Sequence, residues 1–126
     1  MYESLDIFRT AAAMARHAGA RQAVVAQNIA NADTPGYRAR AIGSFAESVA
    51  SGAGSALRAT RPGHMQAQGS VGSVRSEVTQ EEPSPNGNTV SLETEMLNGV
   101  EVAREHSQAL AIYKHALGII RSSLGR

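Results

Sequence analysis

The chain has 126 residues, a formal net charge of +1 and no cysteine. This length allows one small domain, and the near-zero charge excludes any argument for a partner from bulk electrostatics. Val, Ile, Leu and Phe together number only 24, whereas Ala alone numbers 22. Because large core-forming side chains are scarce, we expect a monomer that is only partly ordered. The absence of cysteine excludes disulfides and thiolate metal sites.

The first residues do not predict a secretory signal. Glu3 and Asp6 place acids where such a signal carries bases, and no apolar stretch of adequate length follows them. No other stretch approaches the roughly 20 consecutive apolar residues of a transmembrane helix. We therefore expect a protein that is soluble or assembled and does not span a membrane.

An amphipathic helix is predicted from Leu5 to about Ile29. Apolar and small residues recur there at alternating spacings of three and four, which puts them on one helix face. The stripe comprises Leu5, Phe8, Ala12, Ala15, Gly19, Gln22, Ala26 and Ile29. Because much of it is Ala, a partner helix could approach closely while little apolar area is buried per turn.

The helical pattern stops between Asn28 and Tyr37. Pro35 biases the residue before it away from helical dihedrals, and Gly36 can adopt a positive φ. Pro35 and Gly36 therefore predict the centre of a type II turn.

The segment from Gly43 to Asn88 contains 7 Gly, 8 Ser and 3 Pro among its 46 residues. No helical period is evident there, and Val71, Val74 and Val78 are separated by polar residues and Gly. A short strand or hairpin is compatible with this pattern. The composition favours a flexible or weakly structured excursion over a strand.

A second, longer helix is predicted after the turn residues that end at Asn88. Ser91 is placed to cap it, and acids follow in its first turn, where the helix dipole favours them. An unbroken spacing of four and three then marks a coiled-coil seam. Its positions are Leu92, Met96, Gly99, Ala103, His106, Leu110, Tyr113, Leu117, Ile120 and Leu124. A narrow stripe of this length requires a partner helix, from the same chain or from another copy.

Residues that could support catalysis or metal binding do not converge. His106 and His115 are nine residues apart, about half a turn out of phase on a helix, so they cannot share a metal. His106 and its neighbour Ser107 point in different directions, which argues against a nucleophile and base. The glycines near Ser51 lack the Lys and the third Gly of a phosphate loop. We therefore predict no enzyme activity, no cofactor and no metal site.

Binding to nucleic acid is also not indicated. Arginine supplies 11 of the 12 basic residues, and three of these lie on the first helix. The chain has neither a net basic domain nor a recognisable DNA-binding motif, so a solvated helix face is the simpler interpretation.

The segment from Asn28 to Ala39, Asn-Ile-Ala-Asn-Ala-Asp-Thr-Pro-Gly-Tyr-Arg-Ala, closely resembles the N-terminal signature of bacterial flagellar axial proteins. These are the rod, hook and hook-filament junction subunits. The short middle segment is similar to that of proximal rod proteins rather than of the larger hook and distal rod subunits. The segment from Asn86 to Met96 and the C-terminal helix resemble the same small rod proteins.

The resemblance implies an all-α fold in which two long helices, N- and C-terminal, pack as a coiled coil around a flexible or weakly structured central segment. It divides the chain into an N-terminal axial helix (1–31), a turn segment (32–42), a flexible middle (43–88) and a C-terminal axial helix (89–126). The implied function is that of a structural subunit of the torque-transmitting proximal rod.

Partners and location are implied in the same way. They are other rod subunits and copies of this chain, the rotor membrane ring with its junction protein, and the type III export apparatus, with no nucleic acid and no small-molecule substrate. The implied location is the periplasmic rod of the basal body, reached without a cleaved signal peptide. Another small proximal rod subunit, or a generic helical adaptor of a secretion system, remains the alternative.

Two sets of residues are predicted to carry this function. The first is the assembly seam, consisting of Leu5, Phe8, Ile29, Leu92, Met96, Ala103, Leu110, Tyr113, Leu117, Ile120 and Leu124. The second is the signature turn, consisting of Asn28, Asn31, Thr34, Pro35, Gly36 and Tyr37.

Overall fold

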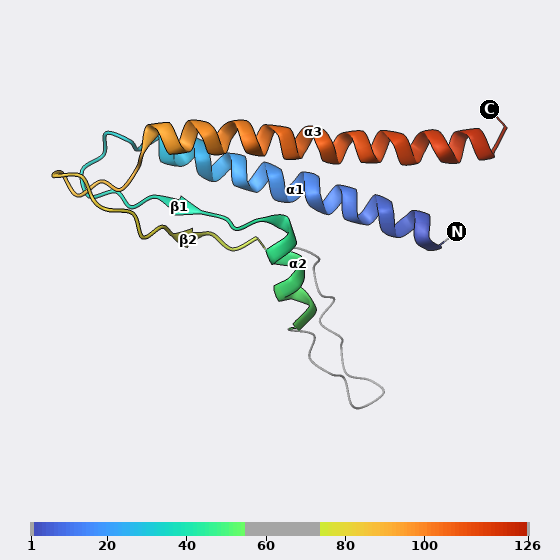
Figure 1. Ribbon diagram of the computed structural model, residues 1–126, viewed down its shortest axis with the longest axis horizontal. Helices are drawn as coiled ribbons and strands as arrows, with labels where there is room; N and C mark the ends of the chain where they lie inside the picture. Colours follow the sequence, from blue (N-terminus) through green and yellow to red (C-terminus); the bar gives the residue numbers. More distant parts are fainter. Residues whose placement is uncertain (1, 55–73, 126) are drawn as a thin grey trace.

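Two long helices form the body of the molecule in the computed structural model, which describes residues 2–54 and 74–125. Helix α1 (Tyr2–Ala30) and helix α3 (Leu92–Ser123) lie side by side (Figure 1). The two chain termini lie at the same end of the pair, so the helices are antiparallel. This confirms the predicted all-α class with packed N- and C-terminal helices.

Three short elements connect the long helices. Strand β1 (Arg40–Ala41) and strand β2 (Glu77–Val78) pair antiparallel, with Arg40 opposite Val78. Helix α2 (Phe45–Gly54) follows β1 and projects away from the helix pair (Figure 1). The strand pair runs beside α1 towards the end of the molecule where the chain turns back into α3.

The core between the long helices is narrow and made of small side chains. Phe8 of α1 packs edge to face against Tyr113 of α3, with ring centroids 5.1 Å apart. The buried apolar residues of the two helices are Ala11, Ala13, Ala18, Val102 and Ala109. Side chains of this size let two helix backbones approach closely but bury little apolar area. The packing therefore stabilises the pair weakly, as the composition predicts.

Helix α3 begins and ends at recognisable signals. The Ser91 side chain accepts a hydrogen bond from the Thr94 amide, and Glu93 and Glu95 occupy the first turn. Arg121 lies in the last turn, and Gly125 follows the helix with a φ of +72°. Acids near the N-terminus and a base near the C-terminus both interact favourably with the helix dipole.

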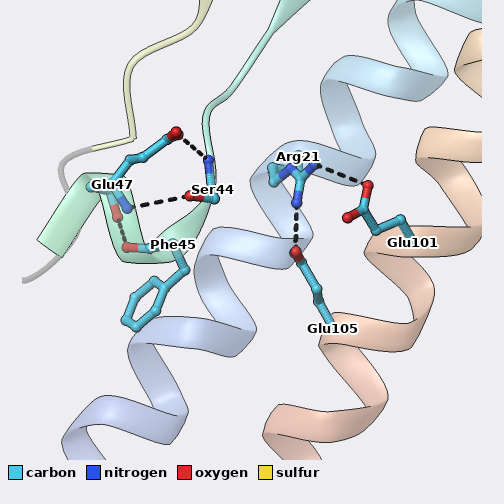
Figure 2. A network of polar contacts seen from close by, with 7 residues as sticks. Arg21, Ser44, Phe45, Glu47, Glu101 and Glu105 are labelled. Atoms are coloured by element: carbon cyan, nitrogen blue, oxygen red, sulfur yellow. Dashed lines mark hydrogen bonds and ion pairs between the residues drawn. The ribbon is translucent and has the colours of Figure 1, made fainter.

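Helix α2 lies where the sequence analysis found no helical period. Ser44 and Glu47 form a capping box: the Glu47 amide donates to Ser44 Oγ at 3.3 Å, and the Ser44 amide donates to Glu47 Oε2 at 2.8 Å (Figure 2). This reciprocal pair satisfies two backbone donors at the helix start. The Ser-x-x-Glu spacing starting at Ser44 was the missed signal.

The structure describes only part of the remaining central segment. Of the strand considered around Val71, Val74 and Val78, the described residues from 74 onward form Glu77–Val78. Val71 and the rest of residues 55–73, on which the prediction of a flexible middle largely rests, lie outside the described residues. Within the described helices, none is both long and apolar enough to cross a membrane.

Candidate functional site

The chain closes one end of the helix pair by folding the residues after α1 against the residues before α3. We call residues 28–41 and 84–95 together the closed end. The Gly36 amide donates to Asn86 O at 3.0 Å, and the Thr89 amide donates to Tyr37 O at 3.1 Å. The Ala39 amide donates to Thr89 Oγ1 at 2.8 Å. Two segments about 50 residues apart are thus joined by backbone hydrogen bonds.

Asn28 is the central residue of the closed end. Its side chain is completely buried, and its Nδ2 donates to Arg40 O at 2.7 Å and to Glu95 Oε1 at 3.0 Å. Its Oδ1 accepts from the Arg40 amide at 3.1 Å and from the Tyr37 hydroxyl at 3.2 Å. An amide side chain offers two donors and two acceptor positions, so all four are occupied. Asn28 therefore connects α1, α3, β1 and the signature turn.

Asn88, in the segment before α3, likewise bonds through its buried side chain to the residues that follow α1. Its Nδ2 lies 2.8 to 2.9 Å from the backbone oxygens of Asn31, Ala32 and Thr34, and its Oδ1 accepts from the Val90 amide at 2.7 Å. The carbonyls that follow a helix have no partner within it, so a side-chain donor satisfies them. Asn88 thus stabilises the end of α1 and the turn that follows.

The signature turn has the geometry expected for a type II turn. Gly36 has a φ of +72°, and the Tyr37 amide donates to Thr34 O at 3.3 Å across Pro35. Thr34 Oγ1 donates to Asn31 Oδ1 at 3.2 Å, which ties the turn to the end of the helix. The third position of such a turn requires a positive φ, which Gly adopts without strain.

Replacing Gly36 with Val is therefore expected to destabilise the closed end by about 1 to 2 kcal/mol, the cost of a left-handed conformation. An added Cβ would meet no atom within 4 Å, so the expected effect comes from the strain of a positive φ and not from a clash at Cβ. Faster amide exchange at Thr89 measures it. Gly19→Val in α1 also meets open space but has no positive φ, so it should not open the closed end.

Glu95 brings a carboxylate into the closed end from the first turn of α3. Only 7% of the residue is exposed. Burial raises the pKa of the Glu95 carboxyl above its usual 4.5, the hydrogen bond from Asn28 opposes the rise, and repulsion from Glu81 adds to it. The ionised carboxylate therefore destabilises the packed state at neutral pH relative to its protonated form.

The pH dependence follows from the direction of this shift. Because the folded pKa lies above the unfolded one, the contribution of Glu95 to stability increases as the pH falls through the folded pKa and levels off below about 4.5. Glu95→Gln should remove this dependence and change stability at pH 7 by no more than about 1 kcal/mol. Amide exchange at Thr79, corrected for intrinsic rates, measures both the pH dependence and the change in stability at pH 7. The exposed Glu93→Gln is the control.

A second polar contact joins the middles of α1 and α3. Arg21 Nη1 lies 2.7 Å from Glu105 Oε1 and 2.8 Å from Glu105 Oε2, while Arg21 Nη2 lies 3.9 Å from Glu101 Oε2 (Figure 2). The Arg21 side chain is mostly buried, so this pair is less screened than a surface ion pair. It fixes the lengthwise position of one helix against the other.

The residues of the predicted assembly seam do not all face α1. Phe8, Leu117 and Ile120 are half-buried, and Tyr113 contacts Phe8. The others for which burial is described are exposed: Ile29, Leu92, Met96, Ala103, Leu110 and Leu124. Leu5 lies within α1, and its side-chain environment is outside the described residues.

The inward face of α3 is centred one residue away from part of that seam. Glu95, Val102 and Ala109 are buried, each one position before Met96, Ala103 and Leu110. At this register Ala109 faces α1 in place of the larger Leu110, which allows the close approach that the Ala-rich α1 favours. Large apolar side chains that are exposed form an outer stripe on α3, which we define as Leu92, Met96, Val100 and Leu110.

The described residues offer little for small-molecule chemistry. No group of three or more His, Asp or Glu side chains in residues 2–54 and 74–125 could hold a metal ion. His106 is half-buried and His115 exposed. A cavity of about 100 Å³ between α1, β1 and α3 is lined by Arg21, Arg40 and Glu95, among others. Ligand pockets usually have at least roughly 300 Å³.

Sequence reasoning missed two residues of the closed end, Asn88 and Glu95. Asn88 was considered only as part of a turn, and Glu95 only as a first-turn acid favoured by the helix dipole. The partners that join them to α1 and the signature turn lie 54 or more residues away, so no local pattern indicates these contacts. One sequence feature could have suggested a buried role: Asn28 and Asn88 both lie next to apolar helical segments, where an amide without a hydrogen-bond partner would be costly.

Part of the chain matches the model of a known protein family. Residues 9–38 match the family model described as flagella basal body rod protein. The matched range covers most of α1 and the signature turn, including Asn28 and Gly36. No curated protein matches the chain. The match spans 30 of the 126 residues, so it shows a similarity to flagellar basal body rod proteins over α1 and the signature turn.

Proposed function

We propose that this chain is a self-assembling subunit of the proximal rod of the flagellar basal body, similar in role to the rod protein FlgB. The observation that carries the proposal is the outer stripe of α3. Met96 is 65% exposed and Val100 is 71% exposed, although both are large apolar residues of a packed helix. Several large exposed apolar side chains along one side of a helix are typical of an interaction site.

The weakness of the helix pair supports the same proposal. The buried residues are mainly Ala, so α1 and α3 together bury too little apolar surface to make a strongly stable unit alone. Packing of the outer stripe against helices of neighbouring copies would supply the missing burial. Weak stability before assembly also suits a subunit that is exported unfolded through a narrow channel.

In this proposal the chemistry of the protein is adhesion between subunits. The exposed residues of the predicted assembly seam, together with the outer stripe, contact copies of the chain and other rod subunits in the periplasm. The most proximal copies adjoin the rotor membrane ring, its junction protein and the export apparatus. Arg21 and Glu105 hold α1 and α3 in register, and the closed end keeps the two helices antiparallel.

The proposal is tested by removing the gene and purifying basal bodies. We expect loss of motility and basal bodies that lack an assembled rod, and both should be restored by the full-length chain. An epitope-tagged chain should cofractionate with the rod in purified basal bodies. If the tagged chain is absent from basal bodies and stays with the export apparatus, the alternative of a helical adaptor is correct and the proposal is wrong.

A further inference from the structure

His17 is a buried histidine without hydrogen-bond partners. Only 2% of the residue is exposed, and neither Nδ1 nor Nε2 has a partner within the described residues. Nearly all buried polar groups in proteins are hydrogen-bonded, because an unpaired donor or acceptor is costly to remove from water. Its neutral ring leaves one donor and one acceptor unpaired, and a protonated ring would leave two donors and a charge.

Helix α2 covers this ring. The rings of His17 and Phe45 meet edge to face, with centroids 5.6 Å apart and planes inclined by 70°. Phe45 is the first residue of α2, and its side chain is directed towards α1 (Figure 2). The capping box of Ser44 and Glu47 fixes the start of α2 and thereby holds the Phe45 ring in place.

The charges around His17 act mainly against its protonation. Burial lowers the pKa of His17 below its usual 6.5, repulsion from Arg21 on the next turn of α1 lowers it further, and Glu105 on α3 opposes both. Glu105 is already engaged by Arg21 at 2.7 Å. On α2, the exposed Glu47 bonds to the Ser44 amide. No carboxylate on the described elements hydrogen-bonds to the ring.

We propose that His17 is an acid-sensitive latch, which holds the start of α2 against α1 while its ring is neutral and releases it when the ring is protonated. Protonation creates a buried charge with two N–H donors and no hydrogen-bond acceptor, whereas undocking of α2 would give the imidazole access to water. Release leaves the α1–α3 pair joined, because the closed end and the Arg21–Glu105 ion pair do not involve α2. The latch is thus independent of the proposed role in the rod.

The pH window follows from the direction of the shift. Undocking of α2 relieves the burial of His17, which is the main cause of its lowered pKa, so the pKa rises from its docked value towards the usual 6.5 while Arg21 still lowers it. Above that pH both states are neutral, and docking has its full stability. As the pH falls below 6.5, the undocked state takes up the proton more readily, so docking weakens.

The absence of cysteine allows a direct test on the full chain. Cysteines introduced at two exposed positions, Ala23→Cys in α1 and Ala50→Cys in α2, can carry spin labels for a distance measurement. We expect a narrow distance distribution at pH 7.5 and loss of that narrow peak at pH 5.0. In His17→Leu and His17→Met, which cannot titrate, the narrow peak should persist at both pH values.

The exposed His115→Gln serves as the matched control and should keep the response of the parent chain. A parent distribution that is equally narrow at both pH values would overturn the latch. So would loss of the peak at pH 5.0 in both His17 variants, because another group would then be responsible. A distribution already broad at pH 7.5 also overturns it, since no docked α2 would exist to be released.

Discussion

Replacing Asn28 with Leu is expected to open the closed end and to cost about 3 kcal/mol or more, because several buried polar groups lose their partner together. The Arg40 carbonyl and amide, the Tyr37 hydroxyl and the Glu95 carboxylate all bond to this one side chain. Leu has a similar volume, so the effect comes from unpaired polar groups and not from a cavity. Hydrogen exchange at the Thr79 and Thr89 amides measures it.

About 3 kcal/mol corresponds to a loss of roughly a hundredfold in exchange protection at those amides. Gln27→Leu is the matched control, because Gln27 is the exposed neighbour of Asn28 and should change protection by less than about 0.5 kcal/mol. The double variant Asn28→Leu with Glu95→Leu should be less damaging than the sum of the single changes. Unchanged protection in Asn28→Leu would show that the network adds nothing to stability.

The long helices were predictable because their signals are local. Alternating apolar spacing, the cap at Ser91 and the stop before Pro35 indicated α1 and α3 to within a few residues of their observed bounds, Tyr2–Ala30 and Leu92–Ser123. A helical period repeats many times over such lengths, so single exceptions do not hide it. Helix α2 has only ten residues and ends in a Gly-rich stretch, and its one clear local signal was the capping box at Ser44.

The inward face of α3 was harder to predict than the helix itself. The series that contains Met96, Ala103 and Leu110 carries no charge, whereas the neighbouring series includes Glu95, so hydrophobicity alone selects the first as the seam. The structure instead buries Glu95, Val102 and Ala109. A buried carboxylate becomes tolerable only when Asn28 is present to bond to it, and that contact depends on the tertiary fold. A pattern of apolar residues alone therefore could not predict which face of α3 packs against α1.

Replacing Leu110 with Asp is expected to abolish incorporation into the rod while leaving the separate chain folded as before. Leu110 is 43% exposed in the outer stripe of α3, so a carboxylate there remains hydrated and costs the unassembled chain little. If copies pack against this stripe, assembly would bury both the lost apolar contact and an unpaired charge, at a cost of several kcal/mol per subunit. Because each added subunit presents the same defect to its neighbours, the loss recurs along the rod.

Two measurements on the same variant separate assembly from folding. Motility and the amount of chain in purified basal bodies should both fall to background, while circular dichroism of the purified chain stays at the parent level. The matched control is Gln108→Asp, which places the same carboxylate at an exposed polar position two residues earlier, on a different side of α3. Normal incorporation of Leu110→Asp would mean that neighbouring copies do not pack on the outer stripe. Equal failure of Gln108→Asp would mean that any added charge on α3 blocks assembly, and the stripe would then have no special role.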